Sequence, residues 1–151
     1  MDGLKLLEKD HKLFRQILAE GEETTERGVK TRTELFDRLK REITIHEQME
    51  EQVLYPALRE VAKSRDIALE GYEEHHVVDE IFGELEQTPP SDETWAAKFK
   101  VAKENLEHHM DEEETDMWKA ARREFTDDEL EAMGNRMLEI KQAGEELMPR
   151  V

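Results

Sequence analysis

The stretch that decides the fold is HEQMEEQV at residues 46–53, which returns 63 residues later as HMDEEETD at residues 109–116. In both copies a histidine is followed four residues later by a glutamate. Residues four apart lie on one face of an α-helix, so His46 and Glu50 point the same way, as do His109 and Glu113. A second pair repeats at nearly the same interval, because Asp10-His11 returns as Glu74-His75. The chain therefore reads as two related helical halves.

Apolar residues recur at steps of three and four along the chain, which is typical of helices that bury one face. In residues 1–27 this stripe includes Leu7, His11 and Phe14, and each of the next three stripes also carries one histidine. Helices are predicted at about residues 2–27, 31–63, 64–87, 91–124 and 126–144. Short connections favour antiparallel neighbours. The prediction is an all-α, up-and-down antiparallel four-helix bundle (residues 1–124) with an extra C-terminal helix (125–151), packed on the bundle or used for dimerisation.

Local signals mark several helix ends. Thr31 with Glu34, and Thr126 with Glu129, have the spacing of capping boxes. The run Thr88-Pro89-Pro90-Ser91 interrupts the helical pattern. Pro56 lies inside a helical pattern and is expected to kink it.

The composition excludes several classes of protein. With 22 basic and 39 acidic residues the formal charge is −17, which disfavours nucleic-acid binding. The absence of cysteine excludes disulfides and thiolate metal sites. No apolar run approaches the length of a membrane span. A cytoplasmic protein, monomeric or homodimeric, is the expectation.

Six polar side chains fall on the core-facing stripes: His11, His46, Glu50, His75, His109 and Glu113. Buried carboxylates without partners cost several kcal/mol each, and Lys and Arg fall on the outer faces. A cation resolves this deficit, and imidazole with carboxylate suits Fe, Mn or Zn. Six ligands are too many for one tetrahedral ion, so we expect two ions bridged by Glu50 and Glu113, with the histidines as end ligands and an open position for a small ligand.

The position of each neighbouring polar residue around its helix separates core-facing from solvent-facing candidates. His75 shares its stripe with apolar residues, whereas His76 faces solvent, and His108 is a weaker candidate ligand than His109. Asp79 follows His75 by one turn and is a possible extra ligand, a hydrogen-bond acceptor or a proton-handling group. Glu51, Glu112 and Glu114 are expected on a solvated face. Tyr55 and Trp118, at matching positions of the repeat, are expected to pack at the end of the bundle.

These motifs together resemble the hemerythrin-like (HHE cation-binding) family over roughly residues 1–124. The resemblance rests on the order of His11, His46-x-x-x-Glu50, His75 and His109-x-x-x-Glu113, and on the segments around them. It implies a non-haem di-iron centre in a four-helix bundle. Members bind dioxygen, sense oxygen or iron, handle peroxide or nitric oxide, or repair damaged iron centres.

The sequence also departs from the oxygen-carrying members of that family. Asp79 stands where they have a second histidine, and Glu113 follows its histidine by four residues rather than five. The favoured function is a di-iron protein that binds and redox-processes dioxygen, hydrogen peroxide or nitric oxide, with catalase-like or oxidase-like turnover left open. The alternatives are a non-enzymatic oxygen or iron sensor or an iron store, and a structural zinc bundle.

Overall fold

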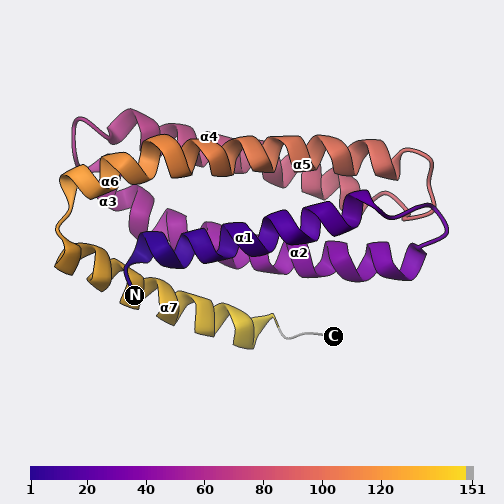
Figure 1. The fold of residues 1–151 in the computed structure, drawn as a ribbon, viewed down its shortest axis with the longest axis horizontal. Coiled ribbons are helices and arrows are strands. Elements are labelled where there is room, and N and C mark those ends of the chain that lie inside the picture. Colours follow the sequence, from indigo (N-terminus) through magenta and orange to yellow (C-terminus); the bar gives the residue numbers. More distant parts are fainter. Residues whose placement is uncertain (149–151) are drawn as a thin grey trace.

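The computed structural model describes residues 1–148, which form helices and loops and contain no strand. Four long segments run alternately up and down side by side (Figure 1), which confirms the predicted all-α up-and-down bundle. They are α1 (Gly3–Glu22), α2 (Val29–Met49), α4 (Arg65–Glu86) and α5 (Trp95–Glu112). Short segments extend α2 and α5: η1 (Glu50–Leu54) and α3 (Tyr55–Arg59) follow α2, and η2 (Glu113–Met117) and α6 (Trp118–Glu124) follow α5.

The fifth long helix, α7 (Asp127–Leu147), lies along the outside of this bundle against α1 and α2 (Figure 1). Two glycines let it approach closely. A Cβ at Gly134 would meet the backbone oxygen of Met1 at 2.2 Å, and one at Gly144 would meet Ile45 at 2.9 Å. The last three residues of the predicted C-terminal range lie outside the described residues. Within residues 1–148, no helix combines the length and the apolar character needed to cross a membrane.

The helix ends follow part of the sequence analysis. The capping box of Thr126 and Glu129 is confirmed, with both reciprocal hydrogen bonds present. The predicted box at Thr31 is wrong, because α2 already begins at Val29 after Gly28. Ser64 precedes α4 as expected, but its hydroxyl donates backwards to the carbonyl oxygen of Leu58 at 2.7 Å.

Two apolar clusters fill the bundle, on either side of the level at which the four buried histidines lie. One contains Leu7, Met49 and Met117, and the other contains Phe14, Ile43 and Leu106. His11 lies between Leu7 and Phe14 in the sequence, and the other buried histidines are flanked in the same way. The polar side chains therefore occupy a short section of an otherwise apolar interior.

The segments η1 and η2 are turns of π-helix, and each begins at a glutamate of the repeat. The backbone N–H of Tyr55 donates to the carbonyl of Glu50, and that of Trp118 donates to Glu113, five residues back in each case. Single π-helical turns occur frequently at functional sites. The expected kink at Pro56 is therefore replaced by a wider turn that begins at Glu50, and Pro56 lies at the start of α3.

Candidate metal centre

The six predicted side chains come together in the middle of the bundle. His11 comes from α1, His46 from α2, His75 from α4 and His109 from α5, and each is at most 4% exposed. Glu50 and Glu113 begin the two π-helical turns and are 0% and 1% exposed. The four helices of the bundle thus each contribute one imidazole to a single buried cluster.

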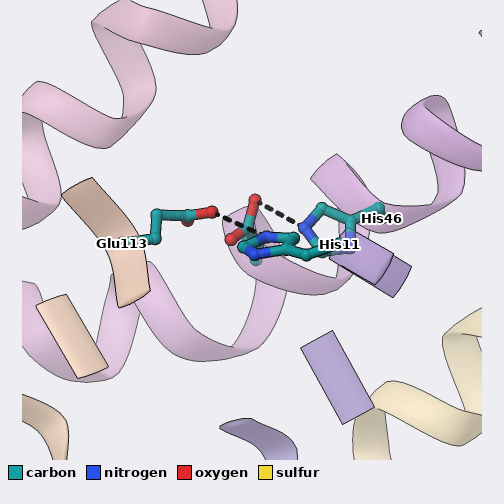
Figure 2. Close-up of side chains that lie close together, drawn as sticks. His11, His46 and Glu113 are labelled. Carbon is teal, nitrogen blue, oxygen red and sulfur yellow. Dashed lines mark ion pairs between the residues drawn. The ribbon is translucent and has the colours of Figure 1, made fainter. Parts of the chain in front are cut away.

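Each glutamate contacts one histidine on its own helix and one on another helix. Glu113 Oε1 lies 3.2 Å from His11 Nε2 and 3.4 Å from His109 Nε2. Glu50 Oε1 lies 3.0 Å from His75 Nε2 and 3.4 Å from His46 Nε2. Figure 2 shows His11, His46 and Glu113 converging from separate helices. All four Nε2 atoms therefore point to the carboxylates at the centre.

The opposite ring nitrogen of every histidine faces another carboxylate. His46 Nδ1 lies 2.9 Å from Asp10, His75 Nδ1 2.9 Å from Glu51, and His109 Nδ1 2.9 Å from Glu74. His11 Nδ1 faces Glu114 at the longer distance of 3.8 Å. A carboxylate on Nδ1 fixes the ring orientation and makes Nε2 a stronger donor to a metal ion. The expectation that Glu51 and Glu114 only face solvent is wrong.

Two of these four supporting carboxylates are themselves paired with a basic side chain. Lys141 of α7 donates to Asp10 Oδ1 at 2.8 Å, so the C-terminal helix contacts the group that holds His46. Arg15 donates from Nη1 to Glu114 Oε1 at 3.2 Å. Within residues 1–148, no Lys or Arg forms an ion pair with Glu51 or Glu74. The support of His11 and His46 therefore differs electrostatically from that of His75 and His109.

Tyr55 and Trp118 both contact the cluster, so the prediction that they only pack at the bundle end is wrong. The Tyr55 hydroxyl donates to Glu113 Oε2 at 2.7 Å and lies 3.2 Å from His75 Nε2. The Trp118 ring stacks on His11, with ring centroids 5.1 Å apart. In a regular α-helix, residues five apart lie about 140° apart around the axis, and the π-helical turn removes most of this offset. The sequence does carry a signal for this contact, because an aromatic residue follows each glutamate of the repeat by five positions.

The remaining candidates lie outside the cluster. His108 is on the surface, paired with Glu112 at 3.0 Å, and His76 is paired with Glu73 at 3.3 Å. Asp79 is exposed, and its carboxylate adds to the effect of burial in raising the pKa of Glu47 to about 9. Glu47 is 8% exposed and is not among the candidates predicted from the sequence. Glu47 Oε2 lies 3.5 Å from His75 Nδ1. Asp79 thus reaches the cluster only through another side chain.

Charge interactions at the cluster shift the pKa values of its members. Burial lowers the pKa of His46, but Glu50 and Asp10 outweigh it and raise the value to about 10. Burial is likewise outweighed at His75 by Glu50 and Glu51, which raise its pKa to about 9. Burial raises the pKa of Glu50, yet His46 and other partners hold it well below its ordinary value. A metal ion that binds these nitrogens must therefore displace protons.

The pairing inside the cluster is incomplete, and this tests whether a metal fits. Five buried atoms of the six central side chains have no hydrogen-bond partner among residues 1–148: His11 Nδ1, His11 Nε2, His46 Nε2, Glu50 Oε2 and Glu113 Oε1. Orphaned buried polar atoms are rare in folded proteins. Donor atoms of His11, His46, Glu50 and Glu113 lie within 4.8 Å of one another, and so do those of Glu50, His75 and His109. The residues present fit two metal positions that share Glu50.

Comparison of the whole chain with known proteins points to a single family. The family model of the hemerythrin HHE cation-binding domain matches residues 2–121. The uncharacterized protein Rv2633c of Mycobacterium tuberculosis and a protein of Mycobacterium bovis are each 31% identical over 140 residues, which is 91% of this chain and 83% of theirs. A crystal structure of an HHE cation-binding domain-containing protein from Mycobacterium kansasii, a homolog of Rv2633c, matches with a TM-score of 0.85. It is 30% identical, and the match covers 97% of this chain and 89% of that one.

Proposed function

The chain belongs to the hemerythrin HHE cation-binding family, and we propose that it is a non-haem di-iron protein that binds and redox-processes a small ligand. The ligand is dioxygen, hydrogen peroxide or nitric oxide. The observation that carries the proposal is the set of orphaned imidazole and carboxylate atoms that converge inside an apolar bundle. Such a cluster needs cations to offset the cost of burial.

Two ions rather than one are supported by the way each carboxylate spans the cluster. We assign His11 and His46 to one ion, and His75 and His109 to the other. Glu50 contacts His46 of the first pair and His75 of the second, and Glu113 contacts His11 and His109, so each carboxylate would be shared by both ions. Tyr55 adds an oxygen beside the second pair. Four nitrogens and a few oxygens suit iron, and also manganese or zinc, better than calcium or magnesium.

Iron held at this centre would supply electrons to a small oxidant, and the protein residues would control the surroundings of the metal. Asp10, Glu51 and Glu74 hold their histidines with Nε2 facing the centre. Tyr55 fixes Glu113 by donating a hydrogen bond. The apolar side chains above and below the cluster exclude bulk water, which strengthens electrostatic interactions inside and limits side reactions.

A sensor is the second candidate, and a specific contact favours it. Lys141 links α7 to His46 through Asp10, so a change at the metal would reach the C-terminal helix. In a sensor, this helix would respond to occupancy of the centre and pass the change to another molecule. An iron store and a structural zinc bundle use the same ligands and differ in what the loaded protein does.

For the protein as a whole, we propose a cytoplasmic monomer or homodimer whose partners are small molecules. The charge of −17 favours this over a nucleic-acid partner, because it repels phosphate backbones.

The test is anaerobic loading with ferrous iron, followed by metal analysis and absorption spectra. We expect two iron ions per chain, and a spectral change when dioxygen, peroxide or nitric oxide is added. Gas evolution from peroxide would identify a catalase-like enzyme, and a long-lived oxygenated band would identify a carrier or sensor. Tight zinc retention without any spectral change on iron loading would contradict a redox function.

A matched pair of variants assigns the binding to the buried cluster. Glu50→Ala removes a carboxylate that contacts both metal positions, so it should abolish tight binding of both ions and the thermal stabilisation that they confer. His76→Ala is the control, because His76 is exposed and contacts only Glu73. Equal iron binding by the two variants would refute the assignment of the site.

A further inference from the structure

A groove of about 460 Å³ opens on the surface between α2 and α4, directly outside the metal cluster. Its wall includes Ile43, Glu47, Glu51, Asp79, Phe82 and Gly83. Ile43 and Glu47 also line the small inner cavity at the four histidines. Only these two side chains are common to both spaces, so they separate the groove from the centre.

Glu47 is the polar side chain at this boundary. It is 8% exposed, and its Oε2 atom has no hydrogen-bond partner among residues 1–148. On the outer side it lines the groove together with Asp79, and on the inner side its Oε2 atom lies 3.5 Å from His75 Nδ1. Movement of Glu47 would therefore open the part of this boundary that Ile43 does not form.

The other half of the bundle is built differently at the same place. The equivalent surface lies between α5 and α1, which pack more closely than α2 and α4. Met110 stands at the position of Glu47 and is 1% exposed. Arg15 stands at the position of Asp79, and its guanidinium extends to Asp111 and Glu114. A long, paired side chain thus covers one surface, and a short carboxylate leaves the other open.

We propose that the groove between α2 and α4 is the path by which a small neutral molecule reaches the metal centre, with Glu47 as its gate. The inference rests on the proposed function and names its access route and ligand class. The inner cavity has about 10 Å³ of free space, close to the minimum for one water molecule, so it admits only a molecule of one or two heavy atoms. Among the described residues, three carboxyl groups line the groove beside a single lysine, Lys40, which is paired with Glu86, so the groove disfavours anions.

Filling the groove tests the route, and nitric oxide is the probe. Gly83 is exposed, and a Cβ there meets nothing within 4 Å, so Gly83→Phe places a ring in the groove without disturbing the core. Asp79→Arg copies the covering residue of the other half. In the anaerobic, ferrous protein both variants should slow nitric oxide association, followed by stopped-flow absorbance, by about tenfold. Gly83→Ala is the matched control and should match the wild type within about twofold.

A charge variant tests the ligand class. Asp79→Asn keeps the size of the side chain and removes its charge. It should leave nitric oxide association unchanged and speed association of fluoride, a one-atom anion, with the ferric protein by about threefold. Unchanged fluoride association would refute the preference for neutral ligands.

The outcomes separate this inference from the proposed function, because iron content is measured in every variant. Slower nitric oxide association with two irons still bound supports the route. Wild-type rates in both Gly83→Phe and Asp79→Arg, with iron retained, would overturn the route alone, and so would slowing confined to Asp79→Arg. Failure of the wild type to bind iron would overturn the proposed function and the route together.

Discussion

The two halves of the bundle agree at the centre and differ behind it. Around the Nε2 atoms they are nearly copies, with one glutamate, one π-helical turn and one aromatic residue in each. Behind the Nδ1 atoms they diverge. Arg15 and Lys141 pair with the carboxylates that face His11 and His46. The carboxylates that face His75 and His109 have no Lys or Arg partner within residues 1–148. The residues that would bind the metal are thus repeated in the two halves. The residues behind the histidines differ, and this difference can give the two metal positions unequal affinities.

The largest expected effect comes from removing one ligand in either half. His11→Ala and His75→Ala should each abolish tight binding of one ion, a loss of at least about a hundredfold in affinity for that position. The ion that remains in His11→Ala should bind more tightly than the ion that remains in His75→Ala. Its histidines are held by Glu51 and Glu74, whose negative charges are not paired with a Lys or Arg within residues 1–148. Zinc titration by calorimetry measures both affinities. Equal affinities in the two variants would break the comparison.

The pH dependence of the metal-free protein tests whether both halves are charged alike. The pKa values of His46 and His75 are raised from 6.5 to about 10 and about 9 in the folded chain. Their protonation therefore stabilises the fold fully below about pH 6.5, and this contribution is lost as the pH rises through about 9 and 10. Urea unfolding of the metal-free protein should show the loss. The zinc-loaded protein, in which the ion replaces these protons, should not show it.

Nuclear magnetic resonance sharpens the same comparison. His75 should lose its proton at a lower pH than His46, because Glu50 and Asp10 raise the pKa of His46 to about 10 and Glu50 and Glu51 raise that of His75 to about 9. Titration of the ring proton signals, assigned with His46→Gln and His75→Gln, measures the order. A reversed order would contradict the stronger hold of Glu50 and Asp10 on the proton of His46.

A smaller effect is expected from Tyr55→Phe, which removes a hydroxyl present in only one half. The change leaves Glu113 without its hydrogen bond and should lower the affinity for the ion beside His75 by about tenfold. The ion beside His11 should weaken less, because the Tyr55 hydroxyl lies beside His75 and reaches the other position only through Glu113. Tyr72→Phe is the control, because that hydroxyl makes only a 3.4 Å contact with a backbone oxygen. Equal weakening of both ions would contradict the assignment of Tyr55 to one half.

The smallest expected effect is also the one with an unusual sign. Lys141→Met removes a positive charge behind Asp10, so it should strengthen ion binding beside His46 by about threefold. Lys103→Met is the control, since Lys103 pairs with Glu22 and Glu107 away from the cluster. Weaker binding in Lys141→Met would mean that Lys141 acts by positioning Asp10 rather than by its charge.

The sequence predicted the bundle and the six central side chains because both follow from the regular 3.6-residue period. His46 and Glu50 are four apart, and this spacing survives in the structure. Tyr55 was misplaced because the π-helical turn shifts the phase beyond Glu50. Lys141 could not be found, because the docking of α7 depends on close packing at Gly134 and Gly144. Periodicity thus predicts which side chains point inward on each helix, but not the face of the bundle against which the extra helix packs.

The stacking of Trp118 on His11 gives the protein a built-in optical reporter. The chain has two tryptophans, and the other, Trp95, stacks on Phe99 within the apolar cluster on the far side of the histidines. Iron bound at His11 would quench the indole emission of Trp118 far more than that of Trp95. Filling of that position could therefore be followed by intrinsic fluorescence in real time, without a dye or a label.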